Sequence, residues 1–190
     1  MAALLHLDSK RLHLRAYSSG DGPMYFQVGQ KNRAHLQCYE SGNIILAARS
    51  EDEAERIIAE ICAAREEQRY FLLGAFDRSS MEFVAQVYAG VINRELPEYE
   101  VGYFVDCDHE GQGYVSESVQ AVLNWLFHDL GAYRVSLGCS DTNLRSARVA
   151  ECCGFVLEGH LRENKRDQVG VYSGELRFGL LRREFIAQFG

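Results

Sequence analysis

Residues 99–117 read YEVGYFVDCDHEGQGYVSE and change their pattern twice. Residues 99–106 are rich in apolar and aromatic side chains and predict a β-strand. Two glycines at 111 and 113 interrupt the pattern, and from Tyr114 apolar residues recur at helical spacing. The first N–H groups of a helix have no acceptor within it and lie at its positive end. This strand–loop–helix unit predicts an anion site suited to a diphosphate, or more simply a tight turn.

The loop carries acidic residues that bear on this interpretation. Asp108 and Glu110 would repel a phosphate, so a diphosphate site requires them to point away or to be neutralised. Two nucleotide-binding loops are excluded. A dinucleotide fold places its glycines after the first strand, with an acid about 20 residues on. The loop here comes past the middle of the chain, and the lysine of a Walker-type loop is absent.

Strand-like and helix-like patterns interleave over the rest of the chain and predict an α/β or α+β fold around a mixed sheet, with residues 1–190 as a single domain. We expect strands at 11–17, 70–76, 82–92, 99–106, 133–139, 155–162 and 169–181. We expect helices at 54–68, 114–130 and 143–152, with two short helices around Gly42 between 23 and 50.

Composition narrows the class of function. Lys and Arg number 20 against 27 Asp and Glu, a net charge of −7 with no basic run, which excludes a typical nucleic-acid binder and suits a cationic substrate. No apolar run approaches the ~20 residues that cross a bilayer, and residues 1–8 lack the basic start of a secretory signal. The 6 cysteines show no metal-ligand spacing, so we expect reduced thiols, no metal and a cytoplasmic setting.

A second polar group lies at the start of the expected helix 143–152. Ser146 follows Asn143 by three positions, so both side chains can line the same side of the first turn. Asn143 is also a good N-cap residue, and a capping side chain can face a cleft as well. If strand 133–139 lies beside strand 99–106, both helix starts open at the same end of the sheet.

Four segments in order, 100–105, 109–117, 141–150 and 153–159, together resemble the GNAT acetyltransferase superfamily, in its ribosomal-protein N-terminal (RimJ/RimL-type) branch. Residues 32–36 also resemble that branch, so the resemblance spans nearly the whole chain. It implies an α+β fold layered α/β/α, with a splayed, mostly antiparallel sheet flanked by helices. It also implies acetyl-CoA as co-substrate, held between two central strands.

The resemblance assigns roles by position. The backbone of Phe104 and Val105 would pair with the pantetheine arm, Asn143 would bond it, and Ser146 would lie near the thioester sulfur. The N–H groups that would hold the pyrophosphate are those of Glu110, Gly111, Gln112, Gly113 and Tyr114.

The chain departs from the family at two catalytic positions. Many members carry a tyrosine general acid where this chain has Ala150, so Ser146 is the best available hydroxyl for the leaving thiolate, with Asn143 beside it. Some relatives place a glutamate base where this chain has Gly138, and Glu100 is our candidate instead. His35 and His109 are weaker candidates.

The expected reaction is direct attack of a neutral primary amine on the thioester, with a strand N–H such as that of Val105 facing the oxyanion. An α-amine, with a pKa of ~7.7–8.0, is easier to deprotonate than a lysine at ~10.4, so a site without a strong base favours a protein N-terminus. One alternative is an acetyltransferase of small-molecule amines (polyamine or antibiotic), in which residues 23–50 would determine the shape of the acceptor pocket. The other is a non-catalytic acyl-CoA-binding module. We expect no membrane partner, and a monomer or a homodimer in which Phe178 and Leu180 mark either a dimer edge or the monomer core.

Overall fold

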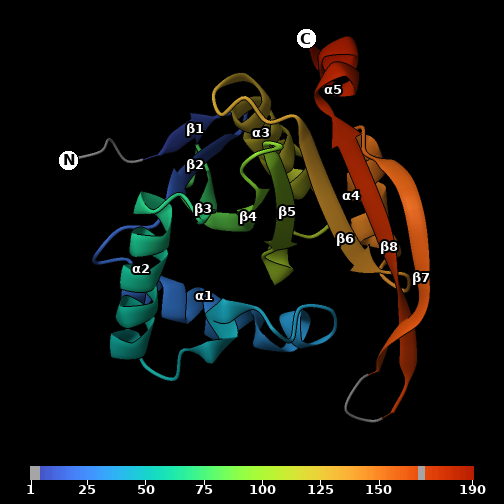
Figure 1. Ribbon diagram of the computed structural model, residues 1–190. Helices are drawn as coiled ribbons and strands as arrows, with labels where there is room; N and C mark the ends of the chain where they lie inside the picture. The colour runs from blue at the N-terminus through green and yellow to red at the C-terminus, as the bar shows by residue number, and fades with distance from the viewer. Residues whose placement is uncertain (1–4, 167–169) are drawn as a thin grey trace.

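The computed structural model describes residues 5–166 and 170–190, which form one eight-stranded sheet in the order β1-β2-β3-β4-β5-β6-β8-β7, with helices on both faces (Figure 1). The strands are β1 (His6–Asp8), β2 (Leu12–Ala16), β3 (Tyr70–Asp77), β4 (Phe83–Asn93), β5 (Glu98–Val105), β6 (Arg134–Ser140), β7 (Val156–Arg166) and β8 (Tyr172–Leu181). The helices are α1 (Gly22–Gln37), α2 (Glu51–Glu66), α3 (Tyr114–His128), α4 (Leu144–Cys152) and α5 (Arg182–Phe189), with 3-10 turns η1 (Ile44–Ala47) and η2 (Cys107–His109).

One strand pair differs from the others. The neighbours are antiparallel except β5 and β6, which run parallel and are connected through α3. Their pairing covers Glu98 to Glu100 on β5 and Arg134 to Ser136 on β6. Beyond these residues the two strands separate, as the lower ends of their arrows show (Figure 1). The expected layered, mostly antiparallel and splayed architecture is confirmed.

Two apolar cores hold the layers to the sheet. One lies under α3 and includes Val119, Leu126 and Leu137, and the other lies under α1 and α2 and includes Tyr25 and Ile58. β5 contributes to both, because Val101 faces the first core and Phe104 the second. Each fully buried side chain of this size stabilises the fold by about 1.5–3 kcal/mol. β5 is therefore fixed from both faces, although part of its β6-facing edge has no strand partner.

The structure differs from the sequence expectation in the first 50 residues and near the C-terminus. The segment before Gly42 forms one helix, α1, rather than a short one, and the segment after it forms only the turn η1. Gly29 lies within α1, where it permits close packing of the helix against η1. A Cβ at this position would come 2.7 Å from the carbonyl oxygen of Ile45. β1 and α5 were not expected. α5 is short and charged, but Phe185 anchors it by stacking on Phe127, with ring centroids 4.7 Å apart.

Two further expectations concern the last strands. Phe178 and Leu180 are 2% and 0% exposed and pack into the core against β6, so they form no dimer edge. The strand expected from 169 begins at Tyr172, and position 169 lies outside the described residues.

The cysteines and the helices bear on two other expectations. All the cysteines are unpaired, as expected. Within the described ranges, no helix is long and apolar enough to cross a membrane.

Candidate functional site

The segment that links β5 to α3, residues 106–113 (the glycine loop), exposes backbone donors. Gly111 and Gly113 have φ angles of 72° and 77°, in the left-handed region that glycine adopts without strain, and Gly113 caps α3. A Cβ on Gly111 would meet no atom within 4 Å, so the backbone is open to a ligand. Among the described residues, none accepts a hydrogen bond from the backbone N–H groups of residues 113–116. These donors at the positive end of α3 suit a diphosphate.

Arg11 supports the outer side of the glycine loop. Its Nε donates to Glu117 Oε2 at 2.6 Å and its Nη1 donates to the carbonyl of Gln112 at 3.0 Å. Its guanidinium also lies over the Tyr114 ring, 4.6 Å from the centroid. Burial raises the pKa of Glu117, but hydrogen bonds from Arg11 and Ser9 outweigh it and lower the pKa below its usual value. The ionised Glu117 thus keeps the turn between β1 and β2 joined to the first turn of α3.

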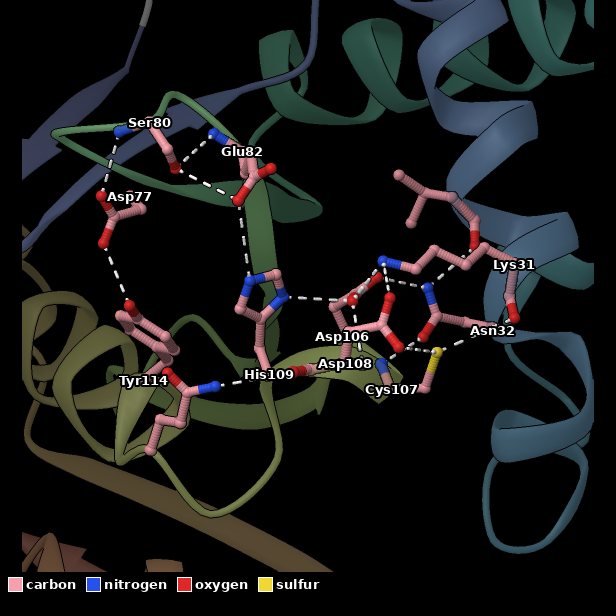
Figure 2. A network of polar contacts seen from close by, with 12 residues as sticks. Lys31, Asn32, Asp77, Ser80, Glu82, Asp106, Cys107, Asp108, His109 and Tyr114 are labelled. Atoms are coloured by element: carbon pink, nitrogen blue, oxygen red, sulfur yellow. Dashed lines mark hydrogen bonds and ion pairs between the residues drawn. The ribbon is translucent and has the colours of Figure 1, made fainter.

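Asp106 anchors the inner side of the loop to α1 (Figure 2). This carboxylate is 1% exposed and accepts hydrogen bonds from Lys31 Nζ at 2.7 Å, from Asn32 Nδ2 at 2.9 Å and from His109 Nδ1 at 3.1 Å. Burial raises the pKa of Asp106, but these bonds and that from the Asp108 N–H outweigh it and lower the pKa. We name Lys31, Asn32, Asp106 and His109 the α1 tether.

The two acids that flank the diphosphate site both pair with cationic side chains. Asp108 lies 2.8 Å from Lys31 Nζ, and Glu110 lies 2.6 Å from Arg145 Nη1 and 3.4 Å from His35 Nδ1. Desolvation lowers the pKa of Lys31, but hydrogen bonds to Asp106 and Asp108 outweigh it and raise the pKa, so the ammonium persists. These cations reduce the repulsion that a diphosphate would meet, although Lys31 is shared between Asp106 and Asp108.

A cavity of about 510 Å³ adjoins the glycine loop, between the end of α1, β5 and the start of α4. This volume falls in the range typical of small-molecule sites. Its lining comprises His35, Leu36, Cys38, Tyr39, Glu40, Tyr103, Phe104, Val105, Glu110, Val115, Thr142, Asn143, Leu144, Arg145, Ser146 and Val149. The cavity lies where β5 has separated from β6, so a thioester arm can pass from the loop toward α4.

The structure brings some of the candidate residues together and leaves others apart. Phe104, Val105, Glu110, Asn143 and Ser146 line the cavity. The other residues expected to hold the pyrophosphate lie next to the cavity, in the glycine loop and the first turn of α3: Gly111, Gln112, Gly113 and Tyr114.

The candidate bases are placed differently from one another. Glu100 is exposed at the last paired position of β5, where β6 diverges, and is not among the cavity-lining residues. His109 is held by Asp106, whereas His35 lines the cavity. These three residues therefore do not share one site.

Asn143 and Ser146 occupy the first turn of α4. The Asn143 side chain accepts a hydrogen bond from the Ser146 N–H at 3.1 Å, which confirms the cap. Sequence reasoning missed Tyr103, whose hydroxyl oxygen lies 3.0 Å from both Ser146 Oγ and the Ser146 carbonyl oxygen. Tyr103 and Ser146 are 43 positions apart, so no local pattern could have indicated this contact.

Three carboxylates, Glu40, Glu100 and Glu175, are candidates to contact the acceptor amine, and we name them the acceptor side. Glu40 follows α1 and lines the cavity mouth, and partial desolvation raises its pKa although it remains in contact with solvent. Glu175 of β8 occupies the space beside Gly138, where a Cβ would lie 2.7 Å from its Oε1. Lys165 at 3.1 Å and Arg177 at 2.8 Å pair with Glu175. Sequence reasoning missed Glu40 and Glu175, because neither belongs to a recognisable motif.

Two clusters among the described residues bring potential metal ligands within 4.8 Å of one another. In the first, Asp106, Cys107 and Asp108, the Lys31 ammonium already lies where a cation would bind both carboxylates. The second, His6, Asp8 and His13, lies on β1 and β2, at the opposite end of the sheet from β6 and α4. Neither cluster includes a residue that lines the cavity.

Comparison with known proteins agrees with this geometry. Residues 11–156 match the acetyltransferase (GNAT) domain family. The chain is 35% identical over 101 residues to the probable N-acetyltransferase YjcK of Bacillus subtilis, a match covering 53% of this chain and 55% of that protein. It is 27% identical over 175 residues to the ribosomal-protein-serine acetyltransferase of Escherichia coli, covering 87% and 93% of the two chains.

A more distant relative and one solved structure complete the comparison. The spermidine N(1)-acetyltransferase of Vibrio cholerae is 24% identical over 155 residues, covering 82% of this chain and 84% of that protein. The structure of RimL, a ribosomal L7/L12 alpha-N-protein acetyltransferase in complex with coenzyme A, superposes with a TM-score of 0.83 at 21% identity, covering 93% of this chain and 98% of that one. At this identity the structural match supports the fold.

Proposed function

The chain belongs to the GNAT acetyltransferase family and is an N-acetyltransferase with acetyl-CoA as co-substrate, and we propose that its acceptor is the N-terminal α-amine of a protein. One observation carries the coenzyme part of this proposal: the free donors of residues 113–116 and the cavity with Ser146 lie along one path, where β5 and β6 separate. The choice of acceptor rests on how easily each kind of amine loses its proton. The relative from Escherichia coli that aligns over most of both chains is named for a ribosomal protein's serine. The unpaired cysteines support a cytoplasmic setting.

The residues of this chain divide the work along that path. The N–H groups of Glu110, Gly111, Gln112, Gly113 and Tyr114 would hold the pyrophosphate, and the open backbone edge at Phe104 and Val105 would align the pantetheine arm. Acetyl-CoA supplies the thioester whose carbonyl the amine attacks. A backbone N–H such as that of Val105 would face the developing oxyanion. Much of the acceleration would come from holding the amine against the thioester.

The proton chemistry falls to two side chains, of which Ser146 lines the cavity and Glu100 lies outside its lining. Ser146, with Asn143 fixing its turn, would donate a hydrogen bond to the leaving sulfur. Glu100 would take the proton from the amine through water, because it sits at the opening between β5 and β6. An α-amine is partly neutral near pH 7, so a carboxylate that acts through water is a strong enough base to remove its proton. This proton demand favours an N-terminus over a lysine.

A small polyamine is the second candidate acceptor. The spermidine acetyltransferase of Vibrio cholerae aligns over most of both chains, and Glu40 places a carboxylate at the cavity mouth. A carboxylate attracts any cationic amine, so this feature alone does not separate the two acceptors.

A matched set of acceptors tests the proposal. Acetyl-CoA binding is first measured by calorimetry, and thiol release is then followed with three acceptors. These are a peptide with a free N-terminal serine, the same peptide blocked at its α-amine but carrying a lysine, and spermidine. We expect acetylation of the first peptide alone, located by mass spectrometry. Acetylation of spermidine alone would support the second candidate, and binding without turnover on any amine would support a non-catalytic module.

A further inference from the structure

Tyr103 brings a phenol to the place where α4 supplies none. Ala150, the α4 position at which many family members carry a tyrosine, is 0% exposed and packs into the core. The hydroxyl of Tyr103 reaches the same cavity from the opposite wall, on β5, and contacts both oxygens of Ser146 at 3.0 Å. A hydroxyl pair therefore spans the cavity between β5 and α4.

The proton count of this pair allows two arrangements. The Ser146 carbonyl oxygen can only accept, whereas each hydroxyl has one proton to donate. In the first arrangement Tyr103 donates to the carbonyl, and the Ser146 hydroxyl donates to Tyr103. In the second, Tyr103 donates to Ser146 Oγ, which leaves the Ser146 proton free to point into the cavity. Negative charge developing there favours the second arrangement.

The surroundings keep Tyr103 protonated and Ser146 in place. Burial raises the pKa of Tyr103 well above its usual value, and the hydrogen bond with Ser146 offsets this in part. Negative charge on Cys139, Cys153 or Glu40 would raise the pKa of Tyr103 further. The cap from Asn143 fixes the backbone of Ser146. The switch between the two arrangements then needs only rotation about the two C–O bonds.

We propose that Tyr103 is a positioning residue for acetyl transfer, because its hydroxyl directs the Ser146 proton toward the leaving sulfur. This inference rests on the proposed function. The amine nitrogen forms the new bond to the acetyl carbon, and the C–S bond breaks with its electron pair going to sulfur. The surplus proton of the amine leaves through water, and one proton returns to the sulfur to give the free thiol. Tyr103 and Ser146 end with the protons that they began with.

Tyr103→Phe tests the proposal by removing only the hydroxyl. We expect kcat with the N-terminal peptide to fall roughly tenfold, the effect of one hydrogen bond made in the transition state, with KM for acetyl-CoA unchanged within about twofold. Tyr99→Phe is the matched control, since Tyr99 lies on the same strand and face but does not line the cavity. It should leave kcat unchanged. Tyr103→Met removes the hydroxyl with a different shape if the first variant does not fold.

A double variant separates positioning from a structural role. Because Tyr103 acts through Ser146, Tyr103→Phe should cost nothing further in a Ser146→Ala background, whereas in Ser146→Thr, which keeps a hydroxyl, it should again cost roughly tenfold. The inference would be overturned if Tyr103→Phe lowered kcat further in the Ser146→Ala background, so that the two losses multiplied. It would also be overturned if Tyr103→Phe alone kept full kcat. A wild-type protein that binds acetyl-CoA but acetylates no amine would instead overturn the proposed function, and this inference with it.

Discussion

The glycine loop and the acceptor side are built differently, although Glu110 of the loop and Glu40 of the acceptor side line the same cavity. The loop offers backbone N–H groups, and the side chains around it, Arg11 outside and the α1 tether inside, bond to the protein. The acceptor side offers carboxylates from separate elements. Those of Glu40 and Glu100 remain in contact with solvent, whereas Glu175 is buried and paired with two cations. A backbone site depends on chain conformation, whereas a side-chain site depends on charge. Substitutions should therefore affect the two regions in different measurements and by different amounts.

Gly113→Val gives the largest expected effect, because it changes the backbone on which the loop depends. The left-handed φ of 77° strains any residue with a Cβ, and a β-branched side chain would also crowd the diphosphate. We expect acetyl-CoA affinity to fall about 100-fold, or about 2.7 kcal/mol, by calorimetry.

Gly159→Val is the control for this substitution. Gly159 has no φ in the left-handed region, and a Cβ there meets nothing within 4 Å. It should leave acetyl-CoA affinity unchanged. Equal affinity in Gly113→Val and wild type would mean that the loop does not hold the coenzyme.

Asp106→Asn is expected to have the next largest effect, through the α1 tether rather than the backbone. The amide keeps the shape of the side chain but loses the charge that holds Lys31. We therefore expect the free energy of unfolding to fall by about 2 kcal/mol and acetyl-CoA to bind several-fold more weakly. The folded-state pKa of Asp106 is lowered from 3.8, so its contribution is complete above pH 3.8 and is lost as the pH falls through the lowered value.

Urea denaturation at pH 7 and below pH 3.8 measures this dependence. The difference between wild type and Asp106→Asn should be largest at pH 7 and shrink in acid. Asp129→Asn, at an exposed position after α3, should change stability by less than about 0.5 kcal/mol. A difference that stays constant with pH would show that the Asp106 charge does not stabilise the tether.

Glu100→Gln moves the test to the acceptor side. If Glu100 receives the proton through water, the substitution should lower kcat about fivefold to tenfold and leave acetyl-CoA affinity unchanged. Thiol release with the N-terminal peptide measures the first quantity, and calorimetry the second. Full kcat would remove Glu100 from the mechanism and leave proton removal to solvent.

The same contrast explains what the sequence could indicate. Gly111, Gly113 and the start of α3 are consecutive, so the anion site could be predicted from local geometry, as could the cap of Asn143 on Ser146. Lys31 and Asp106 are 75 positions apart, and their pairing depends on how α1 crosses the end of β5. Residues from separate elements meet only through tertiary packing, which is why Tyr103, the α1 tether and Glu40 were not predicted.

Glu40→Gln is expected to have the smallest effect. A solvent-exposed carboxylate at the mouth attracts a cationic acceptor by about 1 kcal/mol, so KM for the peptide should rise about threefold to fivefold, with kcat and acetyl-CoA affinity unchanged. Because the pKa of Glu40 is raised from 4.5, its charge is lost at a higher pH than that of an ordinary glutamate. The KM difference between wild type and Glu40→Gln should therefore disappear as the pH falls. Glu51→Gln, at an exposed position of α2, should have no effect at any pH. A KM difference that persists in acid would mean that Glu40 acts on the acceptor by shape rather than by charge, and the acceptor side would then resemble the glycine loop.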